Sequence, residues 1–150
     1  MASINSSGLA GTLLEEYSAL EFILLGDLRD LLEEPPDELT SKWMRAVLDA
    51  LLDTLPRRFD LQEQGGYLEE VLQHYPNWQS QVTELRDEQR AIYAKLGNLR
   101  DRIAGDTPFQ EAADGLSIDL RDWMQGLTAY RRHERRMVQT AFNLEVGCGD

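Results

Sequence analysis

The sequence predicts an all-α protein whose four helices form an up-down-up-down antiparallel bundle. In four long segments apolar residues recur at alternating spacings of four and three, which is typical of helices that bury one face against other helices. No segment shows the alternation of a strand. The breaks between the segments are short, and short connections between long helices make neighbouring helices antiparallel.

The first two helices are separated by two prolines. The first is expected over residues 9–34 and ends before Pro35 and Pro36, because proline cannot continue a helix and also restricts the residue before it. The second begins within residues 37–41, a stretch with good capping residues, and reaches about residue 73.

The second helix contains residues that weaken helices. Pro56 in its interior costs on the order of 3 kcal/mol, so we expect a kink or break at residues 53–56. Gly65 and Gly66 cost about 1 kcal/mol each, and we expect them to let a neighbouring helix approach closely.

The third helix follows Pro76 and Asn77 and runs to about residue 104. Residues 105–108 form the next break, and a short segment follows it. The fourth helix is expected to start within residues 114–117 and to end near residue 143. The chain then fits one domain, residues 1–150, with a flexible N-terminus of about residues 1–8 and a C-terminal tail of about residues 144–150.

Each predicted helix carries one mainly apolar stripe. The stripes comprise Leu13, Tyr17, Leu20, Leu24, Leu28 and Leu31 in the first helix, Trp43, Val47, Ala50, Thr54, Arg58, Leu61, Gly65, Leu68 and Leu72 in the second, Trp78, Val82, Leu85, Gln89, Ile92, Leu96, Leu99 and Ile103 in the third, and Leu116, Leu120, Trp123, Leu127, Tyr130, Glu134, Met137 and Ala141 in the fourth. Glu21 lies beside the first stripe and Gln62 borders the second.

The polar members of the stripes are expected to converge at one level. At 1.5 Å per residue, their distances from the predicted turns differ by only a few ångströms. The residues concerned are Tyr17, Arg58, Gln62, Gln89, Tyr130 and Glu134. A cluster of polar side chains at one level of a four-helix bundle is where such folds build metal sites.

Three stretches carry a resemblance to a known family. They are RRFDLQEQGGYLEEVL at 57–72, VTELRDEQRAIYAKL at 82–96 and YRRHERRMVQTAFN at 130–143. With the spacing between them, they resemble the bacterial hemerythrin-like (HHE cation-binding) proteins, and the resemblance covers most of the chain. It implies a hemerythrin-like bundle. In that family histidine and carboxylate ligands from all four helices hold two irons.

The resemblance also places other residue types where the family has its ligands. The first-helix histidine corresponds to Tyr17, or less well to Glu21; the second-helix histidine and glutamate to Arg58 and Gln62; the third-helix histidine to Gln89, which follows Glu88; and the fourth-helix histidine and acid to Tyr130 and Glu134. Only Glu134 keeps a ligand-type side chain, and a lone carboxylate is a poor iron site. The guanidinium of Arg58 cannot ligate a metal and would repel one.

A metal-free polar core is therefore our hypothesis. Arg58 would pair with Glu134 or Glu21, and the resulting hydrogen-bonded cluster would replace the di-iron centre, since an unpaired buried charge costs several kcal/mol. As alternatives, Arg58 could lie at the edge of its stripe and reach water, and Gln89 and Tyr130 could be ordinary hydrogen-bonded core residues.

The remaining chemistry-bearing residues are interpreted as structural. His74 lies near the end of the second helix, where a cation favours the helix dipole. His133 lies among arginines that we interpret as a solvated face of the fourth helix, with a site for an acidic partner as the alternative; these are Arg131, Arg132, Arg135 and Arg136. Periodicity favours core positions for Trp43, Trp78 and Trp123.

Bulk composition restricts the possible partners. The net charge of −12 argues against nucleic-acid and anionic-membrane binding, which need clustered lysine and arginine. No apolar run approaches the roughly 18 residues of a membrane span, and the N-terminus does not resemble a signal peptide. We therefore expect a cytoplasmic protein, either monomer or homodimer. Cys148 has no second cysteine to pair with, so we expect a free thiol, with intermolecular pairing or reactivity as the alternative.

Three functions remain open. The first is a hemerythrin-like protein that has lost di-iron binding, carries no cofactor, is not an enzyme, and acts as an interaction, structural or regulatory module with an unknown protein partner. The second is an altered cation site, with di-iron or another divalent ion held by oxygen ligands and a role in oxygen, iron or redox sensing; Glu21, Glu63, Tyr17, Tyr130 and Glu134 could contribute. The third is a small molecule bound in the cavity that the metals would occupy.

Overall fold

Every element in the described part of the chain is a helix. The computed structural model describes residues 2–64, 72–103 and 107–148, and their side chains except those of residues 2–10, 64, 141–142 and 144–148. Its labelled elements are α1 (Ala2–Leu32), α2 (Glu38–Gln64), the 3-10 helix η1 (Pro76–Trp78), α4 (Gln79–Ile103) and α5 (Phe109–Cys148). Residues 72–74 are helical as well. The predicted all-α class is confirmed.

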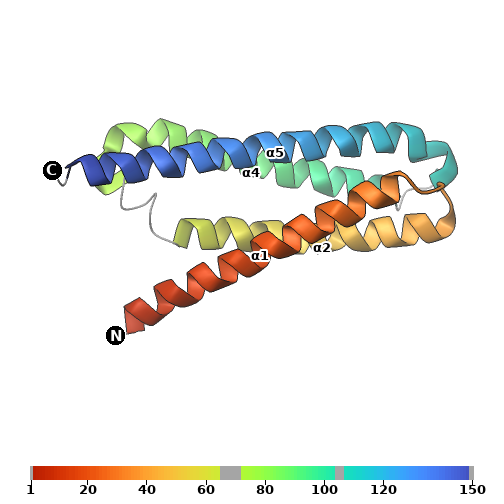
Figure 1. The fold of residues 1–150 in the computed structure, drawn as a ribbon. Coiled ribbons are helices and arrows are strands. Elements are labelled where there is room, and N and C mark those ends of the chain that lie inside the picture. Colours follow the sequence, from red (N-terminus) through yellow and green to blue (C-terminus); the bar gives the residue numbers. More distant parts are fainter. Residues whose placement is uncertain (1, 65–71, 104–106, 149–150) are drawn as a thin grey trace.

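Three of the four long helices, α2, α4 and α5, run roughly side by side along the length of the molecule (Figure 1). α2 packs against both α1 and α4, and α4 also packs against α5. The C-terminal ends of α1 and α4 lie at one end of the molecule, and the start of α1 and the end of α5 lie at the other. α1 crosses its neighbours at an angle, so that its N-terminal half leads away from α5.

The turn between α1 and α2 has the local chemistry that its sequence indicates. α1 ends at Leu32, shortly before the two prolines. The carboxylate of Asp37 accepts a hydrogen bond from the Thr40 amide at 2.8 Å and so caps the first turn of α2. This backbone hydrogen bond, followed by the one from the Thr40 side chain, lowers the pKa of Asp37.

The second helix does not break at residues 53–56, because α2 continues through Pro56. Leu51 and Leu55 are fully buried on one side of the proline and Phe59 is buried beyond it. Burying each such side chain contributes about 1.5–3 kcal/mol, which together outweighs the roughly 3 kcal/mol that proline costs. Gly65 and Gly66, and the predicted end of this helix near residue 73, involve residues outside the described part of α2.

Three predicted helix ends are also wrong. α1 begins at Ala2, within the stretch expected to be flexible, rather than at residue 9. α5 begins at Phe109 and includes both the short segment and the predicted fourth helix. The start fits the packing of the partly buried Phe109 against the core, directly after Pro108. At its other end α5 extends to Cys148, through most of the expected tail.

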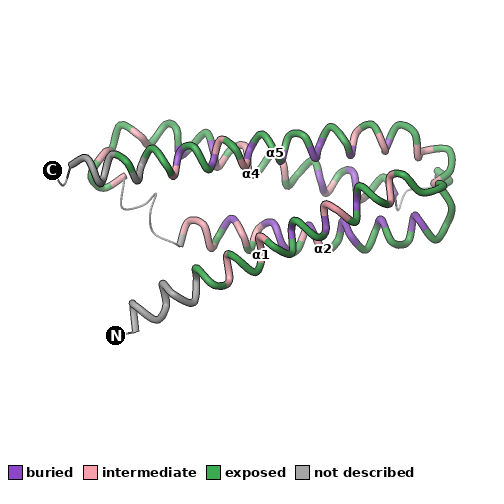
Figure 2. The backbone as a smooth tube through the Cα atoms, viewed as in Figure 1, coloured by how far each residue is buried: buried purple, intermediate pink, exposed green. Residues whose placement is uncertain are grey.

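The core lies along the inward faces of the four helices (Figure 2). Its fully or almost fully buried side chains are Leu28, Leu48, Leu51, Leu55, Val82, Leu96, Leu116, Leu120, Trp123 and Leu127. In α2 the buried stripe passes through Met44, while Trp43 is 56% exposed, so the predicted core position of Trp43 is wrong by one residue. Among the described helices, none is long and apolar enough to cross a membrane.

Candidate functional site

A buried network of charged side chains links α1, α2 and α5. Glu21 of α1 is its centre: one of its carboxylate oxygens accepts a hydrogen bond from Nη1 of Arg58 on α2. Arg131 of α5 donates to the same carboxylate from Nη2 at 2.5 Å and from Nε at 3.2 Å. The two guanidinium groups thus share one carboxylate across three helices.

Glu134 of α5 balances the second positive charge. Nη1 of Arg131 donates to both oxygens of Glu134, at 3.2 and 3.3 Å. The side chains of Glu21, Arg58, Arg131 and Glu134 are 5, 17, 11 and 9% exposed, respectively. Two cations and two anions therefore compensate each other almost without solvent, which is the condition under which buried charges are tolerated.

Neutral side chains extend the network to α4. The hydroxyl of Tyr130 donates to Glu134 at 2.9 Å and accepts from the amide of Gln89 at 2.6 Å. The ring of Phe59 meets Tyr130 edge to face at 5.7 Å. Arg131 lies over both rings, 5.2 Å from the centroid of Phe59 and 5.3 Å from that of Tyr130, within the range of cation–π attraction. We call Glu21, Arg58, Gln89, Tyr130, Arg131 and Glu134 the buried network.

Burial and charge shift the pKa values of three network groups. Burial, followed by repulsion from Arg131, lowers the pKa of Arg58. Burial also disfavours the charge of Arg131, but its hydrogen bond and ion pair with Glu21 outweigh this, and the pKa of Arg131 is raised. The pKa of Tyr130 is raised because burial, and then the charge of Glu134, disfavour the phenolate. At neutral pH both arginines are charged and Tyr130 is a neutral donor.

One polar atom of the network is left without a partner. Nε of Arg58 is buried and makes no hydrogen bond to any described residue. A buried donor without an acceptor costs about 1–3 kcal/mol, so this atom is a natural position for an added acceptor.

The structure brings four of the six predicted core positions together, namely Arg58, Gln89, Tyr130 and Glu134. In α1 the member of the network is Glu21, which the sequence suggested only as an alternative. Tyr17 instead hydrogen-bonds the exposed Arg57, which raises the pKa of Arg57.

The other two candidates from α2 lie outside the network. Gln62 is half-buried, and its side chain makes no hydrogen bond to the described residues. Glu63 pairs with Arg86 at 2.6 Å, and both side chains are 42% exposed.

Arg131 corrects the interpretation of the arginine block as a solvated face. Its side chain is buried between Glu21 and Glu134, although Arg132, Arg135 and Arg136 are exposed. Arg131 follows Tyr130, which belongs to the stripe of the fourth helix. The long side chain of Arg131 can reach the core from that position. Two acids, Glu21 beside the first stripe and Glu134 within the fourth, face the single stripe cation Arg58, and this charge imbalance was the signal that a second cation was needed.

The described residues do not form a donor set for iron. Among them, no three or more histidine, cysteine, aspartate or glutamate side chains gather so that they could hold a metal ion. His133 pairs with Glu88 at 3.1 Å near the surface, and His74 is exposed. Where the resemblance implies a di-iron centre, the structure has arginine–carboxylate pairs, and these residues do not fit that cofactor.

Comparisons with protein-family models, with curated proteins and with solved structures find no match to this chain.

Proposed function

We propose that this chain is a hemerythrin-like, up-down-up-down four-helix bundle that has lost di-iron binding and acts as a non-catalytic interaction, structural or regulatory module. The observation that carries the proposal is the position of the two guanidinium groups. Arg58 and Arg131 hold the carboxylate of Glu21 between them, and Arg131 also holds Glu134.

The chemistry of these groups explains why the bundle would be redox-silent. A guanidinium has five donors and no acceptor, so it cannot ligate a metal and remains positively charged at any physiological pH. The carboxylate oxygens that a metal would need already accept hydrogen bonds. A divalent cation would therefore have to displace two arginines from buried pairs, without the imidazole ligands that iron and zinc favour.

Elemental analysis and visible absorption test this proposal. The protein is purified without chelator, and a second sample is loaded anaerobically with ferrous iron and then desalted. We expect no stoichiometric metal and no near-ultraviolet charge-transfer bands in either sample. Two irons per chain with such bands would overturn the proposal and favour the altered cation site.

The unpartnered Nε of Arg58 favours a second candidate function, the binding of a small hydrogen-bond acceptor in the core. Formate is a suitable probe, because it is small and presents two oxygens to a guanidinium. Binding would raise the melting temperature in proportion to the logarithm of formate concentration above its dissociation constant. The dependence should disappear in Arg58→Lys, which keeps the charge but has no Nε. An equal shift in that variant would exclude this site.

A further inference from the structure

The gap between α1 and α5 contains a basic groove in an otherwise acidic protein. The groove has a volume of about 400 Å³, and its charged lining residues are Arg29, Arg121 and Arg132. None of its lining residues is acidic. The whole chain carries 27 acidic and 15 basic residues, so this groove has the opposite sign of charge to the molecule around it.

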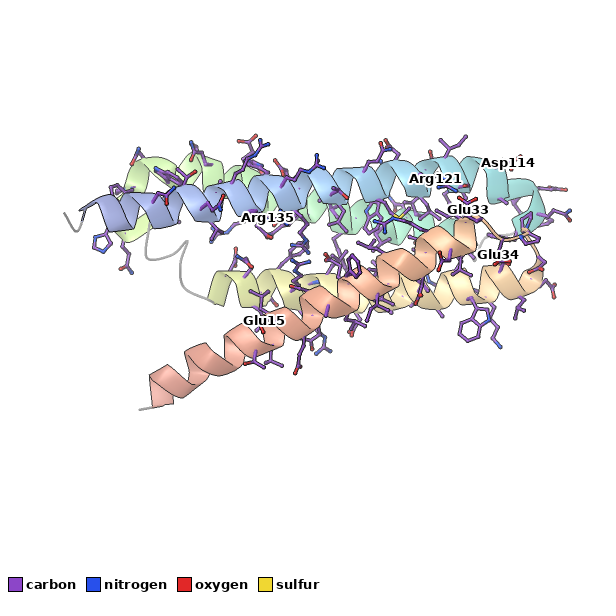
Figure 3. All side chains as sticks on the ribbon, in the orientation of Figure 1. Glu15, Glu33, Glu34, Asp114, Arg121 and Arg135 are labelled. Atoms are coloured by element: carbon purple, nitrogen blue, oxygen red, sulfur yellow. The ribbon has the colours of Figure 1, made fainter. Side chains whose placement is uncertain are left out.

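The arginines are available for an added partner. Arg29 and Arg132 are exposed, and neither makes a salt bridge to any residue in the described ranges. Arg121 pairs with Glu33 at 2.9 Å near the end of α1 (Figure 3), but the two side chains are 45 and 75% exposed. Exposed pairs of this kind contribute only about 0–1 kcal/mol, so another carboxylate can replace Glu33 at little cost.

The residues of α5 that line the groove are spaced like the contact residues of two packed helices. On α5 the polar stripe consists of Arg121, Gln125, Thr128 and Arg132, all of which line the groove at successive spacings of four, three and four. These residues share one helix face over about 16 Å. A stripe of this length and period matches the side chains of a helix laid along it, whereas a single phosphate would span only part of it.

The facing stripe of α1 adds an apolar side chain. Phe22 precedes Arg29 by seven residues, so both lie on one face of α1. Phe22 is 75% exposed, the largest exposed fraction of any large apolar side chain in the described ranges. Because Glu21 pairs with Arg131, Phe22 lies near the level of Arg132. Aromatic side chains and arginine are enriched where protein interfaces concentrate their binding energy.

We propose that the groove between α1 and α5 docks an acidic, amphipathic helix of a partner protein, whose carboxylates pair with Arg29, Arg121 and Arg132 and whose apolar residues cover Phe22. Charge complementarity and stripe spacing select this occupant. The inference rests on the proposed role as an interaction module and supplies the chemistry of the partner.

A labelled synthetic helix tests the surface by fluorescence anisotropy. The peptide carries glutamates at alternating spacings of four and three on one face and leucines beside them, and a control peptide has lysine in place of each glutamate. Salt at roughly 0.15 M screens charges that are more than about 8 Å apart, so the acidic surface elsewhere on the protein repels the peptide only weakly. We expect the acidic peptide to bind and the lysine peptide not to bind.

Variants distinguish the groove from the rest of the surface. Arg29→Gln combined with Arg132→Gln should weaken the acidic peptide by at least roughly tenfold, as should Phe22→Ala. Arg45→Gln, which removes an exposed arginine of α2, should leave binding unchanged. All four substitutions are at exposed positions, and circular dichroism checks that each of the three variants is folded.

Three results would overturn the proposal. The first is that the acidic peptide does not bind, and the second is that it binds the double arginine variant as well as the wild type. The third is that sodium tripolyphosphate binds the wild type but not the double arginine variant, while Phe22→Ala leaves binding of the acidic peptide unchanged. The last result would identify a site for a small phosphorylated ligand. Iron binding is measured separately, so failure of this surface and failure of the metal-free core are distinguishable.

Discussion

Arg131 contacts three members of the buried network, because one guanidinium reaches Glu21 on α1, Glu134 on its own helix and the ring of Tyr130, and it also lies over the ring of Phe59. Removing either carboxylate leaves an excess positive charge where solvent cannot compensate it. Buried pairs broken from one side typically destabilise a protein by 3–5 kcal/mol. The loss of stability caused by a single substitution therefore shows whether the buried charges of the network pair with one another.

Glu134→Ala should lower the free energy of unfolding by about 2–4 kcal/mol. This is less than the typical loss of about 3–5 kcal/mol, because Arg131 keeps its ion pair with Glu21. Urea unfolding followed by circular dichroism measures the change. Glu88→Ala is the matched control: its pair with His133 is more than a third exposed, so the loss should stay below about 1 kcal/mol. If Glu134→Ala has the stability of the wild type, Glu134 does not balance a buried arginine.

Tyr130 should make the protein sensitive to alkali. Its pKa is raised in the folded state, whereas an unfolded tyrosine ionises near pH 10. Above about pH 10 the unfolded chain therefore binds fewer protons at this residue than the folded chain, and stability falls by up to about 1.4 kcal/mol per pH unit. Below pH 10 the contribution is fully present.

Tyr130→Phe should flatten this fall in a series of urea titrations at rising pH. It should also cost about 1 kcal/mol at neutral pH through the lost hydrogen bonds to Gln89 and Glu134. Tyr93→Phe removes an exposed hydroxyl and should keep the wild-type slope. Equal slopes for wild type and Tyr130→Phe would contradict the raised pKa.

Periodicity predicted the network positions that lie directly in the stripes and missed those that reach them from the side. Arg58, Gln89, Tyr130 and Glu134 interrupt apolar stripes, so their meeting could be predicted from spacing and turn positions. Arg131 is one residue off the stripe and enters through the length of its side chain. Sequence spacing does not record side-chain length, and for this reason a buried arginine was assigned to a solvated face.

At the scale of elements, local propensity identified the helices but placed several of their ends wrongly. Pro56 is a poor helix former, and residues 109–113 are predicted as a separate short segment, yet both lie inside continuous helices. Packing of Leu55 and Phe59 in α2, and of Phe109 in α5, supplies free energy that propensity alone does not contain. The ends that were predicted well, at the two prolines after α1, depend on covalent geometry and not on packing.

Gly126 of α5 offers a test of propensity where packing plays no part. A Cβ added there would meet nothing within 4 Å, and Gly126 is exposed in the middle of the helix. Gly126→Ala should therefore raise the free energy of unfolding by about 0.5–1 kcal/mol, measured by urea unfolding. The reverse change nearby, Ala129→Gly at another exposed position, should lower it by a similar amount. A loss of stability in Gly126→Ala would contradict a purely local effect of helix propensity at this position.

At the scale of the whole molecule, the buried network joins the four long helices, α1, α2, α4 and α5. Its hydrogen bonds run from α2 through Glu21 of α1 to α5, and from Tyr130 to α4. Connection of helices by charges does not by itself make the fold stable, since removing four charges from water costs several kcal/mol for each ion. The network is therefore expected to specify the arrangement of the helices more than to stabilise it.

Replacing the whole charge set separates these two roles. The variant combining Glu21→Leu, Arg58→Met, Arg131→Met and Glu134→Leu leaves no unpaired charge, so it should unfold at an equal or higher urea concentration, with a gain of up to about 4 kcal/mol. The Gln89–Tyr130 hydrogen bond can remain. Dispersed amide signals in a two-dimensional NMR spectrum would show that apolar packing alone defines the arrangement of the helices. A stable, helical variant with collapsed signals would show that the charges specify one arrangement, since each arginine accepts only positions in which its carboxylate partners are within reach.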